Sequence, residues 1–328
     1  MNDVTSQILK RLATDLDFLS GEAICQEFGI TRSAVWKHIS LLRADGYHID
    51  AVSGRGYHLV ALTGRPIEAE VEPLLASLRF GRNFHYHAVT ISTNLLAKKL
   101  AGEGAPEGSV VVADCQSGGR GRMGRTWVSP PGVNLYFSLL LRPEVPSLRV
   151  PQLTLLVAAA IHKALNTLSP ALSPMIKWPN DILARGKKLC GVLCEMQSEP
   201  DMTHFVVVGI GINVNQTEMP PDLAERATSL FLERGGLFSR AEILASILNH
   251  FEPLYDEWIL QNDLAFILPY IEKHSLLQAK KVTIEQLNRT LSGAVSGIAP
   301  GGELKLVCVN GQTMLVSSGE AHLYKNYL

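Results

Sequence analysis

The hydrophobic pattern of this chain changes twice, near residue 60 and near residue 278, and this constrains the fold more than any other feature. Helical spacing dominates at first, strand and helix patterns are then mixed, and short β-type segments between glycines end the chain. A chain of 328 residues is too long for one ordinary core. We therefore expect an α+β protein with domains at 1–62, 84–277 and 278–328, and a linker with a short helix at 63–83.

The first domain has the element order of a winged helix-turn-helix. The helices are predicted over residues 4–16, 21–28 and 31–45. A hairpin with a glycine-rich tip follows them. In the third helix Val35, Ile39 and Leu42 share one face, which predicts packing on the first two helices. The opposite face would then enter the major groove of DNA.

Candidate DNA contacts lie on that opposite face and at the tip of the hairpin: Arg32, Ser33, Trp36, Lys37 and Arg55. Between Thr31 and Ala44 this helix carries basic but no acidic residues, which favours a phosphate backbone as its partner. The rest of the segment contains several acidic residues, so a three-helix bundle that binds protein is the alternative. Trp36 fits either a DNA contact or the closure of the core edge.

The domain at 84–277 has a mixed α/β pattern. Strands are predicted near 84–89, 109–115, 135–141, 175–178, 188–195 and 204–212. Helices are predicted near 94–101, 151–168 and 240–261. From about residue 279 onward, short β segments between glycines predict a small barrel.

A loop of glycines and arginines at 116–127 is the most informative segment of the chain. It contains Gly119-x-Gly121-x-x-Gly124, which superficially matches a dinucleotide-binding fingerprint. That fingerprint opens a helix directly, whereas an extended pattern and two prolines follow here. Three arginines within six residues instead predict a flexible cationic loop that closes over a phosphate-bearing ligand. A solvated surface loop is the alternative.

Three more clusters of ligand-type residues lie at strand ends or turns: KWPND at 177–181, GKKLCGVLCE at 186–195 and GIGINVN at 209–215. Each is weak evidence alone. Together with Ser92-Thr93-Asn94 and the loop that begins at Gln116, and in this order, they resemble the biotin protein ligase family. The two ends of the chain resemble the bifunctional members that double as the biotin operon repressor. The resemblance implies a ligase domain of the class II synthetase-like type and a C-terminal SH3-like β barrel.

The resemblance also implies which residues bind biotin: Ser92, Thr93, Asn94, Gln116, Gly119, Arg120, Gly121, Arg122, Lys188 and Gly191. The Ser-Thr-Asn turn and the glutamine would hydrogen-bond the fused ring. Short hydroxyl and amide groups suit a ureido head, which has two donors and one acceptor. The glycine–arginine loop would wrap biotin and the α-phosphate, and Lys188 would contact carboxylate and phosphate.

ATP and its adenylate would be bound by Arg120, Trp127, Lys177, Asn180 and Asn213. The residues with implied catalytic roles are Lys188, Arg122 and Asp181. No permanent metal site is expected, and Mg²⁺ would arrive with ATP near Asp181.

The implied reaction has two halves. The carboxylate of biotin attacks the α-phosphorus of ATP, which gives biotinyl-5′-AMP and pyrophosphate. A carrier lysine then attacks this mixed anhydride and AMP leaves. Two anions must meet in the first half, and Arg120, Arg122, Lys188 and Mg²⁺ would offset their repulsion.

The resemblance implies three macromolecular partners. They are the biotin carboxyl carrier protein of acetyl-CoA carboxylase, a double-stranded DNA operator, and a second copy of this chain when adenylate is bound. Biotinyl-5′-AMP would be both intermediate and corepressor. The chain departs from the family at Tyr324 and Lys325, where members often have an arginine. It also has no tryptophan near Ala227, so the nucleotide contacts of residues 215–230 stay open.

Composition excludes several other classes. A formal net charge of -1 gives no global basic field. The N-terminus carries acids where a signal peptide would carry bases, and the apolar stretch at 153–161 is too short to cross a bilayer. Five scattered cysteines do not suggest a disulfide framework. We therefore expect a cytoplasmic protein without a membrane partner.

Three rival functions remain. The first is a lipoate-type ligase, which would not be expected to combine Ser-Thr-Asn with GRGRMGR. The second is a transcription factor that only senses a nucleotide-like ligand, although Lys188, Arg122 and Asp181 together argue against it. The third is a ligase alone, with an N-terminal domain that is not coupled to DNA binding.

Overall fold

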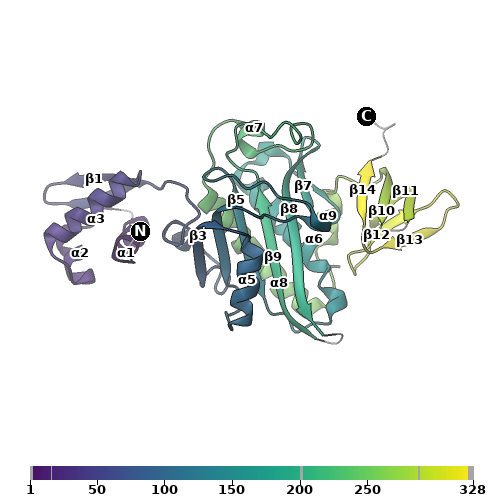
Figure 1. Ribbon diagram of the computed structural model, residues 1–328, viewed down its shortest axis with the longest axis horizontal. Coiled ribbons are helices and arrows are strands. Elements are labelled where there is room, and N and C mark those ends of the chain that lie inside the picture. Colours follow the sequence, from purple (N-terminus) through teal and green to yellow (C-terminus); the bar gives the residue numbers. More distant parts are fainter. Residues whose placement is uncertain (1–2, 16, 200–201, 287–288, 324–328) are drawn as a thin grey trace. The chain divides into compact units, whose positions relative to one another are not determined.

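The computed structural model describes residues 3–15, 17–199, 202–286 and 289–323 (Figure 1). Contacts divide the chain into two compact units. The first contains residues up to Ala76 together with Ser239–Ser246, and the second contains Ser77–Phe238 and the chain from Ile247 onward. The division at Ala76 lies inside the segment expected to be a linker.

Three helices and a two-stranded hairpin make up most of the first unit (Figure 1). The elements are α1 (Asp3–Thr14), α2 (Gly21–Phe28), α3 (Arg32–Ala44), β1 (His48–Val52) and β2 (Gly56–Ala61). Ser20 and Thr31 cap α2 and α3, because their side chains accept from the backbone N–H groups of Ala23 and Ala34. Gly29 takes the left-handed conformation (φ 64°) that the turn between these helices requires.

The core of this unit forms where the sequence predicted it. Buried residues from α1, α2 and α3 pack in one cluster: Ile8, Leu9, Leu12, Ile24, Val35, Ile39 and Leu42. The hairpin strands β1 and β2 pair antiparallel and form the wing. The winged helix-turn-helix is therefore confirmed.

A short helical segment, α4 (Glu68–Val71) and the 3₁₀ turn η1 (Glu72–Leu74), also belongs to the first unit. Glu70 is fully buried and accepts hydrogen bonds from the Tyr47 hydroxyl and the Gly64 backbone N–H, both at 2.7 Å. The Gly64 carbonyl in turn accepts the backbone N–H of Arg240 at 2.9 Å. Residues 63–74 are thus a folded part of this unit, held by a buried carboxylate.

The second unit is built on a seven-stranded sheet with the order β3-β4-β5-β9-β8-β7-β6. The strands are β3 (Phe84–Thr90), β4 (Val110–Gln116), β5 (Leu135–Leu141), β6 (Met175–Lys177), β7 (Asp181–Ala184), β8 (Lys187–Ser198) and β9 (Thr203–Ile212). Only β3 and β4 pair in parallel, and α5 connects them. As a result, the start of α5 and the end of β4 lie at the same edge of the sheet.

The helices of this unit are α5 (Thr93–Gly102), α6 (Gln152–Leu168), α7 (Leu230–Arg234), α8 (Arg240–Gln261) and α9 (Leu268–Lys273). Contacts place α5 on β4, β5 and β9, and α6 on β6, β7 and β8. Every residue of β5 is buried, so this central strand is covered on both faces. The first residues of α8, up to Ser246, are grouped with the first unit.

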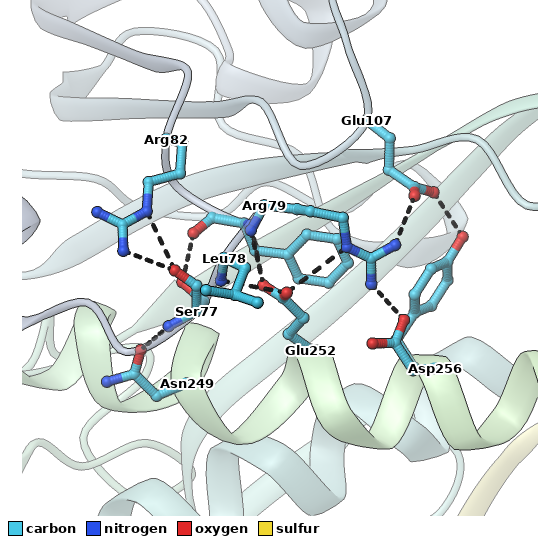
Figure 2. Close-up of polar contacts among 10 residues, drawn as sticks. Ser77, Leu78, Arg79, Arg82, Glu107, Asn249, Glu252 and Asp256 are labelled. Atoms are coloured by element: carbon cyan, nitrogen blue, oxygen red, sulfur yellow. Dashed lines mark hydrogen bonds and ion pairs between the residues drawn. The ribbon is translucent and has the colours of Figure 1, made fainter.

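The second unit begins with a segment that is fixed to α8, as Figure 2 shows. The Glu252 carboxylate accepts the backbone N–H groups of Leu78, Arg79 and Phe80 at 3.1 to 3.2 Å. Burial opposes the ionisation of Glu252, but these N–H groups and Arg79 outweigh it and lower its pKa. Asn249 holds the backbone N–H of Ser77 at 3.0 Å. These contacts fix the backbone that leads into β3.

A C-terminal antiparallel sheet confirms the small β domain. Its strands are β10 (Lys281–Gln286), β11 (Arg289–Ile298), β12 (Leu304–Val307), β13 (Thr313–Val316) and β14 (Glu320–Leu323), in the order β13-β12-β11-β10-β14. The SH3-like form of this domain stays a prediction.

One helical segment, Ser147–Leu168, is long and apolar enough to cross a membrane by length and composition. This segment is longer than the apolar stretch at 153–161, which was expected from the sequence to be too short to cross a bilayer. Of its most apolar window, 72% is buried inside the protein. It therefore serves as the core helix of the second unit, against β6, β7 and β8.

Candidate active site

A pocket of about 570 Å³ lies in the second unit, and all five sequence motifs contribute to its wall. The predicted ligand residues that line it are Ser92, Thr93, Asn94, Gln116, Arg120, Gly121, Arg122, Trp127, Lys177, Asn180, Asp181, Lys188, Gly191 and Asn213. Gly119 does not line it. Instead, the Gly119 carbonyl accepts the Trp127 N–H at 2.9 Å, and a Cβ there would lie 2.5 Å from the Trp127 carbonyl oxygen. Gly119 therefore closes the base of the loop.

A row of hydrogen-bonded polar side chains begins in the pocket wall, which Thr93, Asn94 and Gln116 line, and continues to Ser129 and Ser138, which do not line it. We call it the polar floor, and it consists of Thr93, Asn94, Gln116, Ser129 and Ser138. Gln116 Oε1 accepts the Thr93 backbone N–H at 2.9 Å, and Gln116 Nε2 donates to Ser129 Oγ at 3.1 Å. Ser138 Oγ lies 2.6 Å from Asn94 Oδ1 and 2.8 Å from Thr93 Oγ1. Such neutral hydroxyl and amide groups suit a neutral polar ligand head.

The glycine–arginine loop spans the pocket through contacts of its arginines. It contains a short 3₁₀ turn, η2 (Arg122–Gly124), with Met123 at φ 56°. Arg122 Nη1 donates to Asn180 Oδ1 at 2.8 Å. Arg125 Nη1 donates to Glu320 Oε1 of β14 at 3.1 Å, and this hydrogen bond lowers the pKa of Glu320. The loop thus connects with the KWPND turn and with the C-terminal sheet.

Lys188 and Asp181 face each other in the pocket wall. Lys188 Nζ lies 2.7 Å from Asp181 Oδ1, as an ion pair and not as an aligned hydrogen bond. The side chains are only 35% and 18% exposed, so solvent screens their charges weakly. An anionic ligand would meet an ammonium group that a carboxylate already holds in place.

Trp127 explains two of the glycines in the motifs. A Cβ on Gly211 would lie 2.5 Å from the indole, and a Cβ on Gly191 would lie 3.1 Å from it. The strands β8 and β9 therefore need glycine where the indole lies flat against them. Trp127 Nε1 is buried and has no acceptor among the described residues. It is a donor that a ligand oxygen in the pocket can use.

Asn180 and Asp181 present side-chain oxygen atoms beside Arg122 and Lys188 in the pocket. Asn180 Oδ1 accepts from Arg122, and Asn180 Nδ2 donates to the Val192 carbonyl at 2.9 Å. Within the described ranges, no group of three or more His, Cys, Asp or Glu residues could hold a metal ion. A cation at Asp181 would therefore need further ligands from a bound phosphate or water.

Several pocket residues escaped the sequence analysis. Arg125 and Glu320 form the loop's contact with β14, although they are far apart in the sequence. Met219, Pro220 and Leu223 line the pocket beside Ala227, where no tryptophan is present. The pocket thus has an aliphatic wall at the loop whose nucleotide contacts were left open. Tyr324 and Lys325 lie outside the described residues.

The candidate DNA contacts in the first unit differ in their surroundings. Arg32, Ser33, Trp36 and Lys37 are exposed on α3. Trp36 is 64% exposed, so it does not close the core edge. Arg55 at the wing is held by Asp17 at 2.9 Å and lies 4.2 Å from the centre of the Phe18 ring.

Comparisons with known proteins agree with this architecture. The sequence model of the biotin/lipoate A/B protein ligase family matches residues 86–213, and that of an HTH domain matches residues 4–58. The bifunctional ligase/repressor BirA of Bacillus subtilis is 40% identical over 292 residues, which is 88% of this chain and 89% of that protein. The Escherichia coli protein of the same name is 29% identical over 306 residues, 93% of this chain and 92% of its own length.

A solved structure gives the same result. Biotin protein ligase from Aquifex aeolicus, in complex with biotin and ATP, superposes with a TM-score of 0.65 at 28% identity. The match covers 74% of this chain and 100% of that one. Fold and pocket together define a protein with a winged helix-turn-helix and a ligand-binding α/β domain. The chain belongs to the biotin/lipoate A/B protein ligase family, and its element order is that of the bifunctional ligase/repressors.

Proposed function

We propose that this protein is a biotin protein ligase that also represses transcription of biotin synthesis genes. It converts biotin and ATP to biotinyl-5′-AMP and pyrophosphate, and it transfers biotin to a lysine of a carrier protein. The observation that carries this proposal is the convergence of five separate motifs on one pocket. Relatives with this domain order are named bifunctional ligase/repressor.

In this proposal the ring system of biotin lies on the polar floor. Thr93 and Gln116 supply acceptors for its ureido N–H groups, and Ser92 adds a buried hydroxyl. The apolar tail then runs along Trp127 toward Lys188, whose Nζ lies 5.5 Å from the centre of the indole ring. The carboxylate of biotin is thereby directed to the cationic part of the pocket.

The activation of biotin requires its carboxylate to approach the α-phosphate of ATP. Lys188, Arg120 and Arg122 all line the pocket, and in this proposal they lie around the point where these two anions meet. Fixed positive charges in a partly enclosed pocket stabilise the charge that develops on the phosphorus oxygens. Mg²⁺, when bound with ATP, would neutralise further phosphate charge, and Asp181 and Asn180 would be its oxygen ligands from the protein.

The loop protects the adenylate from water in this proposal. Arg122 reaches Asn180 and Arg125 reaches Glu320, so the loop is held on two sides of the pocket. A mixed anhydride hydrolyses in water, and exclusion of solvent extends its lifetime. The carrier lysine then attacks the carbonyl carbon of the adenylate, and AMP leaves.

The repressor function rests on the first unit and on dimerisation. One recognition helix gives limited affinity, whereas a dimer presents two to the half-sites of an operator. One edge of β8 could pair with a strand of a second chain, because β7 pairs only with the first part of β8, up to Gly191. Within the described chain, Cys194–Gln197 pair with β9 alone, which leaves their other edge open. Adenylate would act as the corepressor that favours the dimer.

The test uses the full-length protein with Mg-ATP, biotin and an apo carrier domain. We expect the carrier to gain the mass of one biotinyl group on its lysine, and lipoate in place of biotin to give no product. Transfer of lipoate with equal efficiency would contradict the proposed specificity. Transfer of biotin without any operator binding would leave a ligase with an uncoupled N-terminal domain.

A further inference from the structure

Glu195 of β8 does not line the pocket, yet it contacts a residue that does. Its Oε2 accepts a hydrogen bond from Asn94 Nδ2 at 2.7 Å, and its Oε1 lies 2.5 Å from Lys98 Nζ on α5. Burial opposes ionisation of this carboxyl, but the hydrogen bonds from Lys98 and Asn94 outweigh it and lower the pKa of Glu195. A charged acceptor therefore lies directly beneath the polar floor.

This carboxylate determines which way the Asn94 amide points. A carboxylate only accepts, so the NH₂ group of Asn94 must face Glu195 and its Oδ1 must face away. The Leu193 carbonyl, also an acceptor, lies 3.4 Å from the same Nδ2 and favours the same orientation. Gly209 leaves the space for it, because a Cβ there would lie 2.1 Å from Asn94 Oδ1.

The orientation of Asn94 fixes the next hydroxyl in the row. Ser138 has one hydroxyl hydrogen and two neighbours, Asn94 Oδ1 at 2.6 Å and Thr93 Oγ1 at 2.8 Å. Asn94 Oδ1 can only accept, so the hydrogen of Ser138 goes to it. Ser138 then has no hydrogen left to donate to Thr93 Oγ1.

The hydroxyl of Thr93 has its own acceptor in Gln116. Thr93 Oγ1 donates its hydrogen to Gln116 Oε1 at 3.2 Å, and Gln116 Oε1 also accepts the backbone N–H of Thr93 at 2.9 Å. Ser138 Oγ lies 2.8 Å from Thr93 Oγ1, but its hydrogen is directed to Asn94. Thr93 Oγ1 therefore keeps its lone pairs for an N–H donor of a ligand.

We propose that Glu195 is a positioning residue for biotin: through Asn94 it holds the hydrogen of Ser138 away from Thr93 Oγ1, so that this hydroxyl oxygen can accept a ureido N–H group. This inference rests on the proposed function, which puts the ureido head on the polar floor. Without Glu195 the Asn94 amide can rotate, and the hydrogen of Ser138 then competes with the ligand for Thr93 Oγ1. The affected quantity is recognition of the ureido group and not the chemistry at phosphorus.

The experiment compares Glu195→Leu, Glu195→Gln and the control Lys98→Met in steady-state adenylate formation. Glu195→Leu should raise the KM for biotin at least about tenfold, since a misdirected hydrogen bond in a buried site is costly. The KM for ATP and kcat should stay within about twofold, because neither reports on the ureido site. Glu195→Gln and Lys98→Met should change the biotin KM less than about threefold, because both keep an acceptor facing Asn94. Desthiobiotin, which keeps the ureido group, should show the same factors as biotin.

A rescue pair covers the case in which Glu195→Leu does not fold. Asn94→Asp places two carboxylates against each other and should raise the biotin KM. Glu195→Gln in that background restores one donor and one acceptor across the same contact and should recover most of the loss.

Two results would overturn the inference: an unchanged biotin KM in Glu195→Leu, or an equal rise of the biotin and ATP KM values. Absence of rescue by the pair would overturn it too. The variant Thr93→Val distinguishes a failure of this inference from a failure of the proposed function. If Thr93→Val raises the biotin KM and Glu195→Leu does not, the site stands and the role of Glu195 is wrong. If neither changes it, the ureido head does not lie on the polar floor at all.

Discussion

Lys188 is held by Asp181 at 2.7 Å in a weakly solvated wall, and this placement fits a role in the transition state. We predict that Lys188→Ala lowers kcat for adenylate formation by about 10² to 10³, as loss of one charge-stabilising group typically does. Biotin affinity should fall much less, because the ring is bound elsewhere. Single-turnover kinetics and equilibrium binding separate the two effects. The control is Lys187→Ala, whose ammonium group donates to the Ala224 carbonyl. Normal turnover in Lys188→Ala would remove this lysine from the mechanism.

For Arg122 we propose a role in retention of the intermediate. Its guanidinium donates to Asn180 at 2.8 Å and ties the loop to the KWPND turn. We predict that Arg122→Gly still forms adenylate but releases it at least about tenfold faster, because the loop loses a charge-assisted contact. Release of labelled adenylate by filter binding measures the rate. The control is Arg185→Gly, since Arg185 is exposed and has φ 47°, which glycine adopts without strain. Equal retention by both variants would contradict the prediction.

The buried His162 on α6 is expected to make the stability of the folded protein depend on pH. It is 1% exposed, its Nε2 lies 3.0 Å from the Pro174 carbonyl, and its Nδ1 lies 2.7 Å from the Tyr270 hydroxyl. The carbonyl only accepts, so Nε2 carries the hydrogen of a neutral ring. Burial first, and the nearby His274 second, lower the pKa of His162 to about 4.

A lowered histidine pKa stabilises the folded protein in its neutral form. We predict that this contribution is complete above about pH 6.5 and is lost as the pH falls toward about 4, on the order of 3 kcal/mol at most. Denaturant unfolding between pH 7 and 4 measures it. His162→Gln should give a shallower pH dependence, whereas replacement of the exposed His48 should not. Identical pH profiles for wild type and His162→Gln would show that His162 does not titrate as expected.

Among the elements, the longest patterned segments were predicted well from the sequence. The helix expected at 151–168 is α6, and the strand expected at 204–212 is β9, because their apolar residues follow one period throughout. The short strand β7 was not predicted, since Asp181–Ala184 begins inside the KWPND cluster and carries no period of its own. The short helix expected in the linker is α4, but its position at 68–71 could not be predicted, because it depends on the buried Glu70 and its partners Tyr47 and Gly64.

The same distinction applies to the pocket. Motif residues such as Lys188 and Arg122 could be chosen from local sequence, and the structure places them in one wall. Arg125–Glu320 and Asn94–Glu195 could not be predicted, because each pair joins segments far apart in the chain. Local pattern carries no information on such pairs, and only the fold reveals them.

The contact between the loop and β14 predicts a role for the C-terminal sheet. The pair Arg125–Glu320 is partly exposed, at 57% and 32%, so it contributes little to stability. We predict instead that Arg125→Glu or Glu320→Arg raises the KM for ATP about three- to tenfold, since either reversal repels the loop from the sheet. Steady-state kinetics for both variants and the double reversal measure the coupling. Additive effects in the double variant, without recovery, would mean that the pair does not hold the loop.

At the scale of the whole molecule, the proposed function requires that the two activities share one ligand. The ligase pocket lies in the second unit, and the candidate DNA-binding helix α3 lies in the first. Adenylate can affect DNA binding only if it binds the repressing state more tightly than the other state. In the proposed function a dimer is that state, because its two recognition helices would act together and its formation can depend on an ordered pocket loop. Ligand affinity and dimerisation are then linked in both directions.

We therefore predict that biotin plus ATP shifts the protein from monomer to dimer and raises its affinity for an inverted-repeat operator at least about tenfold. Sedimentation velocity and a DNA shift assay, each with and without the two substrates, measure the two halves of this linkage. Apo carrier protein should reverse both effects, because it discharges the adenylate. Met196→Lys, which adds a charge at the open edge of β8, should weaken dimerisation while adenylate formation continues. If neither the oligomeric state nor the operator affinity changes when adenylate is bound, the winged domain is not coupled to the ligase.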